Sequence, residues 1–232
     1  MAEEGLVLGG RTLDVACGAG NLAAAVHARG GEAWGMDPSP EMLGIGRYLF
    51  SEDQVPLLRG IAEALPFRPG SFDRIICQGS LDHFVNPRAF MAEAAQVLSP
   101  DGRLIIALCN YESISCHVGR FRQWLGRDLL RRPRSQERGY WDMPPDHFHR
   151  GEPSFIRRLG GSSLELERLY GISLLWPVYG WDKVLERLPR TFARGLLTTL
   201  DQIAGGAPAI ADMIVSVWRH KQPTTAHGNN NA

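Results

Sequence analysis

The sequence predicts an α/β domain, namely a mostly parallel β-sheet with helices on both of its faces. Over roughly the first 110 of the 232 residues, short apolar runs alternate with segments of helical periodicity. That alternation is typical of parallel strands joined by crossover helices. Hydrophobic residues make up 44% of the chain and charged residues 22%, which is enough apolar material for one buried sheet. The length accommodates one such domain together with an elaboration.

The segment from residue 11 to residue 30 predicts a strand, a tight loop and a helix. RTLDVAC is a short apolar run that glycines interrupt, and NLAAAVHARG then takes up helical spacing and stops at a Gly-Gly pair. The elements expected next are a strand at 31–37, a helix at 38–50 with the cap Ser39 and the first-turn Pro40, strands at 55–60 and 71–79, a helix at 86–98 and a strand at 101–110.

The pattern changes after residue 110. Residues 111–150 hold eight arginines and five acidic residues, with Trp124 and Trp141 between them, and we expect an inserted helical cap there. The later elements are expected to be a helix at 153–161, a strand at 163–176, a helical segment at 181–206 and a strand at 209–221. We therefore predict a single domain over residues 1–220, followed by a disordered polar tail at 221–232.

Charge and cysteine usage exclude several classes of protein. Lysines plus arginines equal aspartates plus glutamates at 25 each, so no net field draws the protein to nucleic acid. The first ten residues lack the pattern of a secretory signal, and no uncharged apolar stretch is long enough to cross a bilayer. No CxxC pair occurs among Cys17, Cys77, Cys109 and Cys116. These features predict a reduced, cytoplasmic protein without a structural zinc and without nucleic-acid or integral-membrane partners.

The glycine-rich loop after the first strand has two readings. Gly18, Gly20 and Ala23 fit the spacing of a dinucleotide-binding loop, and Asp37 follows at the end of the second strand, where an acid can accept both ribose hydroxyls. Taken alone, this pattern favours a nicotinamide or flavin enzyme. Asp14 argues against a pyrophosphate, because a carboxylate beside the loop repels the anion. A cationic nucleoside suits both acids, and S-adenosylmethionine has that chemistry.

At this point the sequence resembles the class I S-adenosylmethionine-dependent methyltransferases, in particular the broad group that includes ubiquinone and menaquinone biosynthesis enzymes. DVACGAG resembles the group's first motif, D-x-G-C-G-x-G, with Ala16 in place of the first glycine. Further segments similar to the group follow in order, and they are GMDPSPEML, GIAEALPFRPGSFDRIICQ and LDHFVNPRAFMAEAAQVLSPDGRLIIA. The resemblance covers about residues 11–108. It implies a Rossmann-like sheet of seven strands whose last strand is antiparallel, and methyl transfer to a small molecule.

The resemblance also implies a cofactor site. The residues expected to bind S-adenosylmethionine are Asp14, Ala16, Cys17, Gly18, Gly20, Asp37, Pro38, Met42, Ala62, Glu63, Gln78 and Gly79. The glycines would approach the methionine portion, Asp37 the ribose, and Asp14 the ammonium group or an ordering water. Ile61 departs from the group, which usually has an aspartate near the adenine amine, and Ala62 and Glu63 are expected to flank adenine here. About ten residues precede the first strand, so the closing element is expected from the insert at 111–150.

Histidines are the candidates for acid–base chemistry. His83 follows the fourth strand, where the methyl group should emerge, and a general base there would suit a phenol, carboxylate or enolate. A helix-start histidine bonded to backbone is an equal alternative. For Asp14 the structural alternative is a cap of the helix that begins near Asn21, and its position in the motif favours the cofactor role over that alternative. His147 and His149 are spaced i, i+2 and face opposite ways on a strand, so we predict no metal site.

Three classes of function stay open from the sequence alone. The first is transfer of a methyl group to a small-molecule acceptor, anionic or aromatic if the arginines of 120–138 form a lid instead of a solvated face. The second is an NAD(P)-dependent oxidoreductase, although the Y-x-x-x-K spacing of Tyr179 and Lys183 is better explained by chance. The third is a catalytically silent methyltransferase-like binding protein. Neither the acceptor atom nor the oligomeric state follows from the sequence.

Overall fold

The computed structural model describes residues 10–50, 55–129, 138–161 and 163–222. Their strands form one sheet of seven in the order β3-β2-β1-β4-β5-β7-β6. The strands are β1 (Arg11–Val15), β2 (Glu32–Asp37), β3 (Leu57–Arg59), β4 (Phe72–Gln78), β5 (Leu98–Cys109), β6 (Leu164–Ile172) and β7 (Met213–His220). Strands β1 to β5 pair in parallel, whereas β7 runs antiparallel to both β5 and β6. The predicted sheet and its antiparallel last strand are confirmed.

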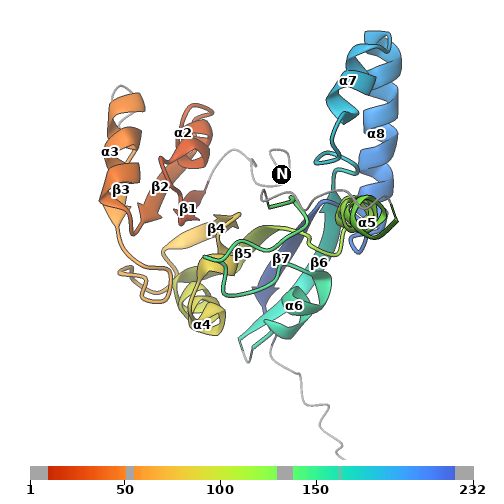
Figure 1. The fold of residues 1–232 in the computed structure, drawn as a ribbon. Coiled ribbons are helices and arrows are strands. Elements are labelled where there is room, and N and C mark those ends of the chain that lie inside the picture. The colour runs from red at the N-terminus through yellow and green to blue at the C-terminus, as the bar shows by residue number, and fades with distance from the viewer. Residues whose placement is uncertain (1–9, 51–54, 130–137, 162, 223–232) are drawn as a thin grey trace, which may run out of the picture.

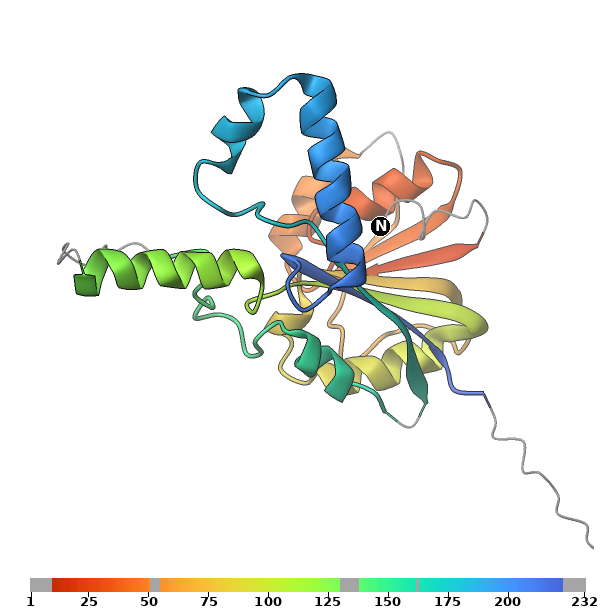
Figure 2. The same cartoon turned by 90° about the vertical axis from the view of Figure 1, so that its right-hand side faces the viewer.

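Helices cover both faces of the sheet. They are α2 (Asn21–His27), α3 (Pro40–Leu49), α4 (Pro87–Val97), α5 (Ile114–Trp124), α6 (Pro153–Arg158), α7 (Trp181–Glu186) and α8 (Arg190–Gly206), with a 3-10 turn η1 (Leu81–His83) and a π-helical turn η2 (Leu125–Leu129). Figure 1 shows α2 and α3 on one face, and α4 and α6 on the other. Figure 2 shows α5 extending outward from the sheet. Among the described helices, none is long and apolar enough to span a membrane.

Apolar side chains fill both faces because successive residues of a strand point to opposite sides. In β4, Ile75 belongs to the main core cluster beside α4, whereas Ile76 belongs to the cluster on the other face. In β5, Leu104 and Ile105 divide in the same way. Trp218 of β7 is fully buried, and its indole N–H donates to Ser216 Oγ at 2.9 Å. Two-sided burial of this kind explains why the strand segments read as continuous apolar runs.

Several element boundaries differ from the sequence-based expectation. β6 ends at Ile172 because Ser173 and Leu175 adopt positive φ angles of 64° and 66°, which extended strands exclude. The helical segment 181–206 is two helices, since Pro189 at the N-cap of α8 cannot continue a preceding helix. Within the predicted cap, α5 and η2 are helical and the described residues 138–150 are not. Residues 130–137 of the cap, and the expected tail from residue 223 on, lie outside the described residues.

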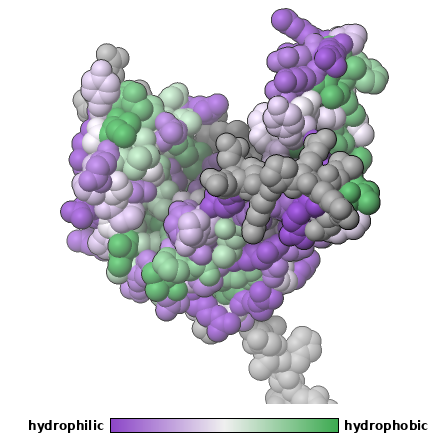
Figure 3. All heavy atoms as spheres, viewed as in Figure 1, coloured by the Kyte–Doolittle hydropathy of each residue, from purple (hydrophilic) through white to green (hydrophobic). Residues whose placement is uncertain are grey.

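The space-filling view shows two raised parts of the surface (Figure 3), which correspond to α2 with α3 and to α7 with α8 in Figure 1. Apolar side chains are exposed on both. On α3, Tyr48 is 83% exposed and Leu49 57%. On and before α7, Tyr179 is 80% exposed and Trp176 73%. Both raised parts of the described surface therefore carry exposed apolar side chains. These side chains belong to segments outside the glycine loop.

Helix α3 lies directly against the glycine loop, and Gly46 makes this approach possible. A Cβ atom at Gly46 would lie 2.2 Å from the carbonyl oxygen of Ala19, whereas one at Gly44 in the same helix would meet nothing within 4 Å. Gly46→Ala should lower the free energy of unfolding by about 1–3 kcal/mol. Gly44→Ala should raise it by about 0.5–1 kcal/mol, because alanine favours the helix. Urea denaturation measures both, and equal shifts for the two variants would contradict this packing.

Candidate active site

The glycine loop turns sharply at the carboxyl end of β1. Ala16, Gly18 and Gly20 all have positive φ angles, of 55°, 57° and 83°. Gly18 and Gly20 adopt this region without steric cost, whereas Ala16 holds a conformation that a side chain disfavours. Gly20 is also the N-cap residue of α2, and it has no side-chain cap. The loop therefore brings bare backbone, followed by the amino end of a helix, to one edge of the sheet.

Asp37 at the end of β2 holds this loop in place. Its Oδ2 accepts a hydrogen bond from the backbone N–H of Gly18 at 2.8 Å, and its Oδ1 accepts one from the N–H of Ser39 at 2.9 Å. Ser39 is the N-cap of α3, and its Oγ accepts from the N–H of Met42 at 3.1 Å. Because each carboxylate oxygen can accept more than one hydrogen bond, Asp37 keeps acceptor capacity for a ligand hydroxyl.

Asp14 lies in β1 with only 3% of its surface exposed. Burial raises the pKa of its carboxyl from 3.8 to about 7, the backbone N–H of Ala23 in α2 opposes that rise, and the nearby charge of Asp37 adds to it. Because it accepts from the Ala23 N–H, Asp14 also caps the first turn of α2. This is the structural alternative that the sequence left open. A cation at the loop would favour the ionised form of Asp14.

Cys17 lies in the same loop, and its thiol is poorly suited to nucleophilic chemistry. Burial, with the charges of Asp14 and Asp37, raises the pKa of the Cys17 thiol to about 12. The thiolate is the reactive species, and it is scarce at neutral pH when the pKa lies so high. Cys17, like the other three cysteines, is free. This environment suits Cys17 as a small space-filling residue of the loop.

The remaining predicted cofactor residues lie where the neighbouring strands end. Gly79, with φ of 68°, follows β4, and its N–H donates to the carbonyl of Ala107 at 2.8 Å. Gln78 is exposed at the end of β4, Ala62 is buried, and the Pro38 carbonyl accepts from Arg59 Nε at 3.2 Å. Their roles toward a cofactor stay predictions.

Glu63, expected beside adenine, has a structural partner. Its Oε1 accepts a hydrogen bond from the backbone N–H of Asn86 at 3.3 Å, and Asn86 is the N-cap residue of α4. Ile61, two residues earlier, is 53% exposed. The carboxylate of Glu63 is therefore engaged at the start of α4, and its expected position beside adenine stays a prediction.

A histidine–carboxylate cluster follows β4, close to the loop. Ser80 Oγ lies 3.2 Å from the carbonyl oxygen of Gln78 and 3.5 Å from that of Ala16, so this segment adjoins the loop. Two residues later, Asp82 is 2% exposed, and its Oδ2 lies 2.9 Å from Nδ1 of His147. The His83 and His147 rings meet edge to face, with centroids 4.2 Å apart. The hydroxyl of Tyr111 lies 3.5 Å from the same nitrogen of His147.

The sequence predicted neither Asp82 nor Tyr111 as a site residue. Both follow strands at the carboxyl edge of the sheet, and that position was the available signal. The predicted base, His83, is 40% exposed at its side chain, and its Nδ1 lies 3.3 Å from the carbonyl oxygen of Asp146. The His83 ring is therefore in contact with the backbone of a distant segment, and not with that of its own helix start.

His147 and His149 diverge, as their spacing suggested. His149 stacks on Phe155 with a centroid distance of 5.2 Å and an interplanar angle of 11°. Asp82, His83 and His147, however, present one ligand atom each within 4.8 Å of one another, a grouping that could hold a metal ion. The i, i+2 spacing of His147 and His149 does not reveal this grouping, because the fold brings His83 from another segment to His147.

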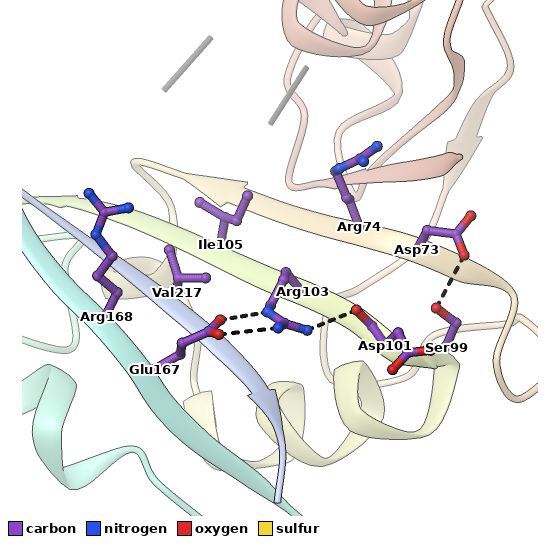
Figure 4. A pocket seen from close by; sticks show the side chains of 9 residues that line it. All are labelled: Asp73, Arg74, Ser99, Asp101, Arg103, Ile105, Glu167, Arg168 and Val217. Carbon is purple, nitrogen blue, oxygen red and sulfur yellow. Dashed lines mark hydrogen bonds and ion pairs between the residues drawn. The ribbon is translucent and has the colours of Figure 1, made fainter. Parts of the chain in front are cut away.

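A cavity of about 500 Å³ lies away from this edge, near the starts of β4 and β5 (Figure 4). Several of its charged side chains have protein partners, since Arg103 bonds to Glu167 and Asp73 accepts from Ser99 Oγ at 3.1 Å. Paired charges of this kind leave little for a ligand to satisfy. We assign the chemistry to the carboxyl edge and not to this cavity.

The arginines of the insert do not all face solvent, since Arg120 is bonded to residues that follow β5. Arg120 donates to the carbonyl of Tyr111 at 3.0 Å and lies 3.6 Å from a Glu112 oxygen. On α5, Phe121 is 59% exposed and Trp124 51%. Helix α5 extends outward from the sheet in Figure 2. The lid function expected of this segment stays a prediction, and three of its arginines fall within the undescribed residues 130–137.

The strand order, the antiparallel β7 between β5 and β6, and the glycine loop after β1 define a class I methyltransferase fold. Residues 13–106 match the family model described as a methyltransferase domain. This part of the chain is therefore similar to methyltransferase domains, in agreement with the resemblance that the sequence motifs indicated.

Curated relatives are similar to part of this sequence, and solved structures are similar to its fold. The chain is 32% identical over 105 residues to the ubiquinone biosynthesis O-methyltransferase of Xylella fastidiosa, a match covering 44% of this chain and 43% of the relative. It is 39% identical over 108 residues to the demethylmenaquinone methyltransferase of Clavibacter sepedonicus, covering 46% and 43%. These matches span less than half of each relative's length.

A solved structure from Thermotoga maritima, titled an S-adenosylmethionine-dependent methyltransferase and possible histamine N-methyltransferase, covers 95% of this chain and 86% of its own. It has a TM-score of 0.55 and 18% identity. At this identity the similarity concerns the fold.

Proposed function

We propose that the protein transfers the methyl group of S-adenosylmethionine to a small-molecule acceptor. The observation that carries the proposal is the loop at Gly18, held by Asp37 and flanked by the buried Asp14. Two carboxyls beside bare backbone suit a ligand with a ribose diol and positive charges, and they disfavour a pyrophosphate. The same two carboxyls therefore disfavour the oxidoreductase alternative, whose dinucleotide carries a pyrophosphate.

The Y-x-x-x-K spacing adds nothing to the oxidoreductase alternative. Tyr179 is 80% exposed, and Gly180 adopts a φ of 86° as the N-cap of α7. Tyr179 therefore precedes the helix that contains Lys183, and the two residues do not share one helical face. Their contact is a cation–π approach, with Lys183 Nζ 5.8 Å from the ring centroid.

The cofactor would supply a methyl group already activated by its positive sulfur. The residues of this chain would then mainly align acceptor and donor and exclude water. Gly18 and Gly20 would admit the methionine portion, Asp37 would accept from the ribose, and Asp14 would face positive charge. The cytoplasmic location and the single-domain organisation remain predictions.

The acceptor class is proposed from the relatives. Two of them are named for methylation in ubiquinone and menaquinone biosynthesis. We therefore propose a small aromatic acceptor, with no nucleic acid involved. The balanced charge of the chain agrees with that choice.

A thermal-shift screen tests the proposal. S-adenosylmethionine and S-adenosylhomocysteine should raise the melting temperature, since a ligand that binds only the folded state stabilises it. NADH, NADPH and FAD should leave it unchanged. Turnover is then checked as formation of S-adenosylhomocysteine with hydroxylated aromatic acceptors. Stabilisation by NADPH alone would contradict the proposal, and binding without turnover would indicate a silent binding protein.

A further inference from the structure

We propose that His147, oriented by the buried Asp82, is the general base that takes the proton from a hydroxyl acceptor. The inference rests on the proposed function, and it names a residue and an acceptor class for it. Asp82 acts through His147 and is a positioning residue. Asp82 lies after β4, on the segment whose Ser80 lies beside Ala16 of the glycine loop, and His147 reaches Asp82 from the distant segment 138–150. The acceptor is expected at this edge of the sheet.

The segment that carries His147 is fixed to η1 by main-chain and side-chain bonds together. The backbone N–H groups of Phe148 and His149 both donate to the carbonyl of Asp82, at 2.8 and 3.2 Å. The carboxylate of the same residue meets His147 Nδ1 at 2.9 Å. One residue therefore anchors both the chain and the ring. A site held this closely is preorganised, which catalysis by proton transfer requires.

The hydrogen bond to Asp82 leaves only one nitrogen of His147 for chemistry. A carboxylate accepts, so Nδ1 carries the proton and Nε2 keeps its lone pair. The carboxylate also stabilises the positive charge that forms when Nε2 takes a proton. His147 is shielded, with its side chain 11% exposed, but it is not sealed. The groups that face it are Asp82 and His83 from η1 and Tyr111 after β5.

His83 is less suited to this role than His147. Its side chain is 40% exposed, and its partners are the backbone carbonyl of Asp146 and, at 3.6 Å, the Asp146 carboxylate, which is 68% exposed. An exposed ion pair of this kind contributes little, because water screens it. The edge-to-face contact places His83 as a wall beside the His147 ring. His83 would thereby limit the directions from which an acceptor reaches Nε2.

The proposed step balances without another reactant. A lone pair of the acceptor oxygen forms the bond to the methyl carbon, and the carbon–sulfur bond breaks with its electron pair going to sulfur. The cationic sulfonium becomes the neutral thioether of S-adenosylhomocysteine. The hydroxyl proton moves to Nε2 of His147 and is then lost to solvent. A weakly acidic hydroxyl, such as a phenol, needs such a base, whereas a neutral amine has its lone pair available already.

The experiment compares wild type with His147→Ala and Asp82→Asn, and His27→Gln serves as control because His27 is exposed at the end of α2. The probes are catechol, 3,4-dihydroxybenzoate and 1,4-dihydroxynaphthalene, with histamine as an amine. We expect methylation of the hydroxyl probes. His147→Ala should lower kcat by about 10²- to 10⁴-fold, with the acceptor KM and the binding of S-adenosylhomocysteine close to wild type.

Two readouts separate a base from a structural residue. Added imidazole should restore part of the activity of His147→Ala, and its rate should rise with pH as the phenolate fraction rises. Asp82→Asn should lower kcat and alter the pH profile. If that variant fails to fold, ¹⁵N NMR of the wild type gives the answer, because the proposal requires the Nδ1–H tautomer of His147. An Nε2–H tautomer would contradict it.

Other outcomes overturn the proposal and are distinct from failure of the proposed function. Methylation of histamine but of no hydroxyl probe would exclude the acceptor class. Unchanged kcat and pH profile in His147→Ala would exclude the base. Turnover that EDTA abolishes and Mg²⁺ or Zn²⁺ restores would show that Asp82, His83 and His147 hold an ion. A wild-type protein that binds no S-adenosylhomocysteine would instead refute the proposed function.

Discussion

Replacing Asp37 by alanine is expected to weaken the binding of S-adenosylhomocysteine by at least about 100-fold. The carboxylate accepts hydrogen bonds from the N–H groups of Gly18 and Ser39, so the variant loses the bonds that hold the loop against α3. It would also lose the proposed acceptor for the ribose hydroxyls. Hydrogen bonds to a charged group contribute about 1.5–3 kcal/mol each, and two of them correspond to about 3 kcal/mol or more. Isothermal titration calorimetry measures the change.

Ser39→Ala is the matched control for this variant. It removes the Oγ that accepts from the Met42 N–H, and so it removes the cap of α3, but the backbone N–H that donates to Asp37 remains. The loss of a cap should cost about 1 kcal/mol of unfolding free energy. The affinity for S-adenosylhomocysteine should stay close to wild type. Equal affinity in Asp37→Ala and wild type would remove Asp37 from the site.

Replacing Asp14 by asparagine is expected to change how stability depends on pH. The carboxyl has a pKa of about 7 in the folded protein against 3.8 as its ordinary value, mainly because it is buried. The folded state therefore binds more protons than the unfolded state between these values, and stability falls as pH rises through that window. The full fall is about 4 kcal/mol. Asp14→Asn should lack this fall in stability. The stability of the variant relative to wild type should therefore increase from pH 5 to pH 8.

Denaturant titrations at pH 5 and pH 8 measure this effect. Asp73 gives a control of opposite sign, because hydrogen bonds from the Arg11 N–H and from Ser99 lower the pKa of its carboxyl. Stability contributed by Asp73 is present above its ordinary pKa and is lost as pH falls. Asp73→Asn should therefore not reproduce the gain at pH 8. The same pH dependence in Asp14→Asn and wild type would show that Asp14 is not desolvated.

The sheet was predictable because its signals are local. Apolar runs, glycine stops and caps lie within a few residues of each other, and the caps at Ser39 and Asn86 occur as bonds to Met42 and Ala89. The positive φ angles of Ser173 and Leu175, which end β6 early, carried no glycine signal. The π-helical turn η2 likewise follows α5 without a break that the sequence marks.

The candidate site was predictable in part for the same reason. The loop and Asp37 lie in one contiguous motif, and the structure joins them by the Gly18–Asp37 hydrogen bond. The pairing of Asp82 with His147 connects segments far apart in the sequence, and no local pattern encodes it. Treating His147 and His149 as a pair followed from sequence spacing, whereas the fold brings His83 to His147 instead.

Calorimetry at pH 6.5 in buffers of different ionisation enthalpy tests most directly whether the buried acids select a cation. The carboxyl of Asp14, with its pKa of about 7, is mostly protonated at that pH. Binding of S-adenosylhomocysteine should place its ammonium nearby and release up to one proton, and Asp14→Asn should abolish the release. NADPH should not bind. The account would be contradicted if NADPH bound saturably while S-adenosylhomocysteine either did not bind or bound without releasing a proton.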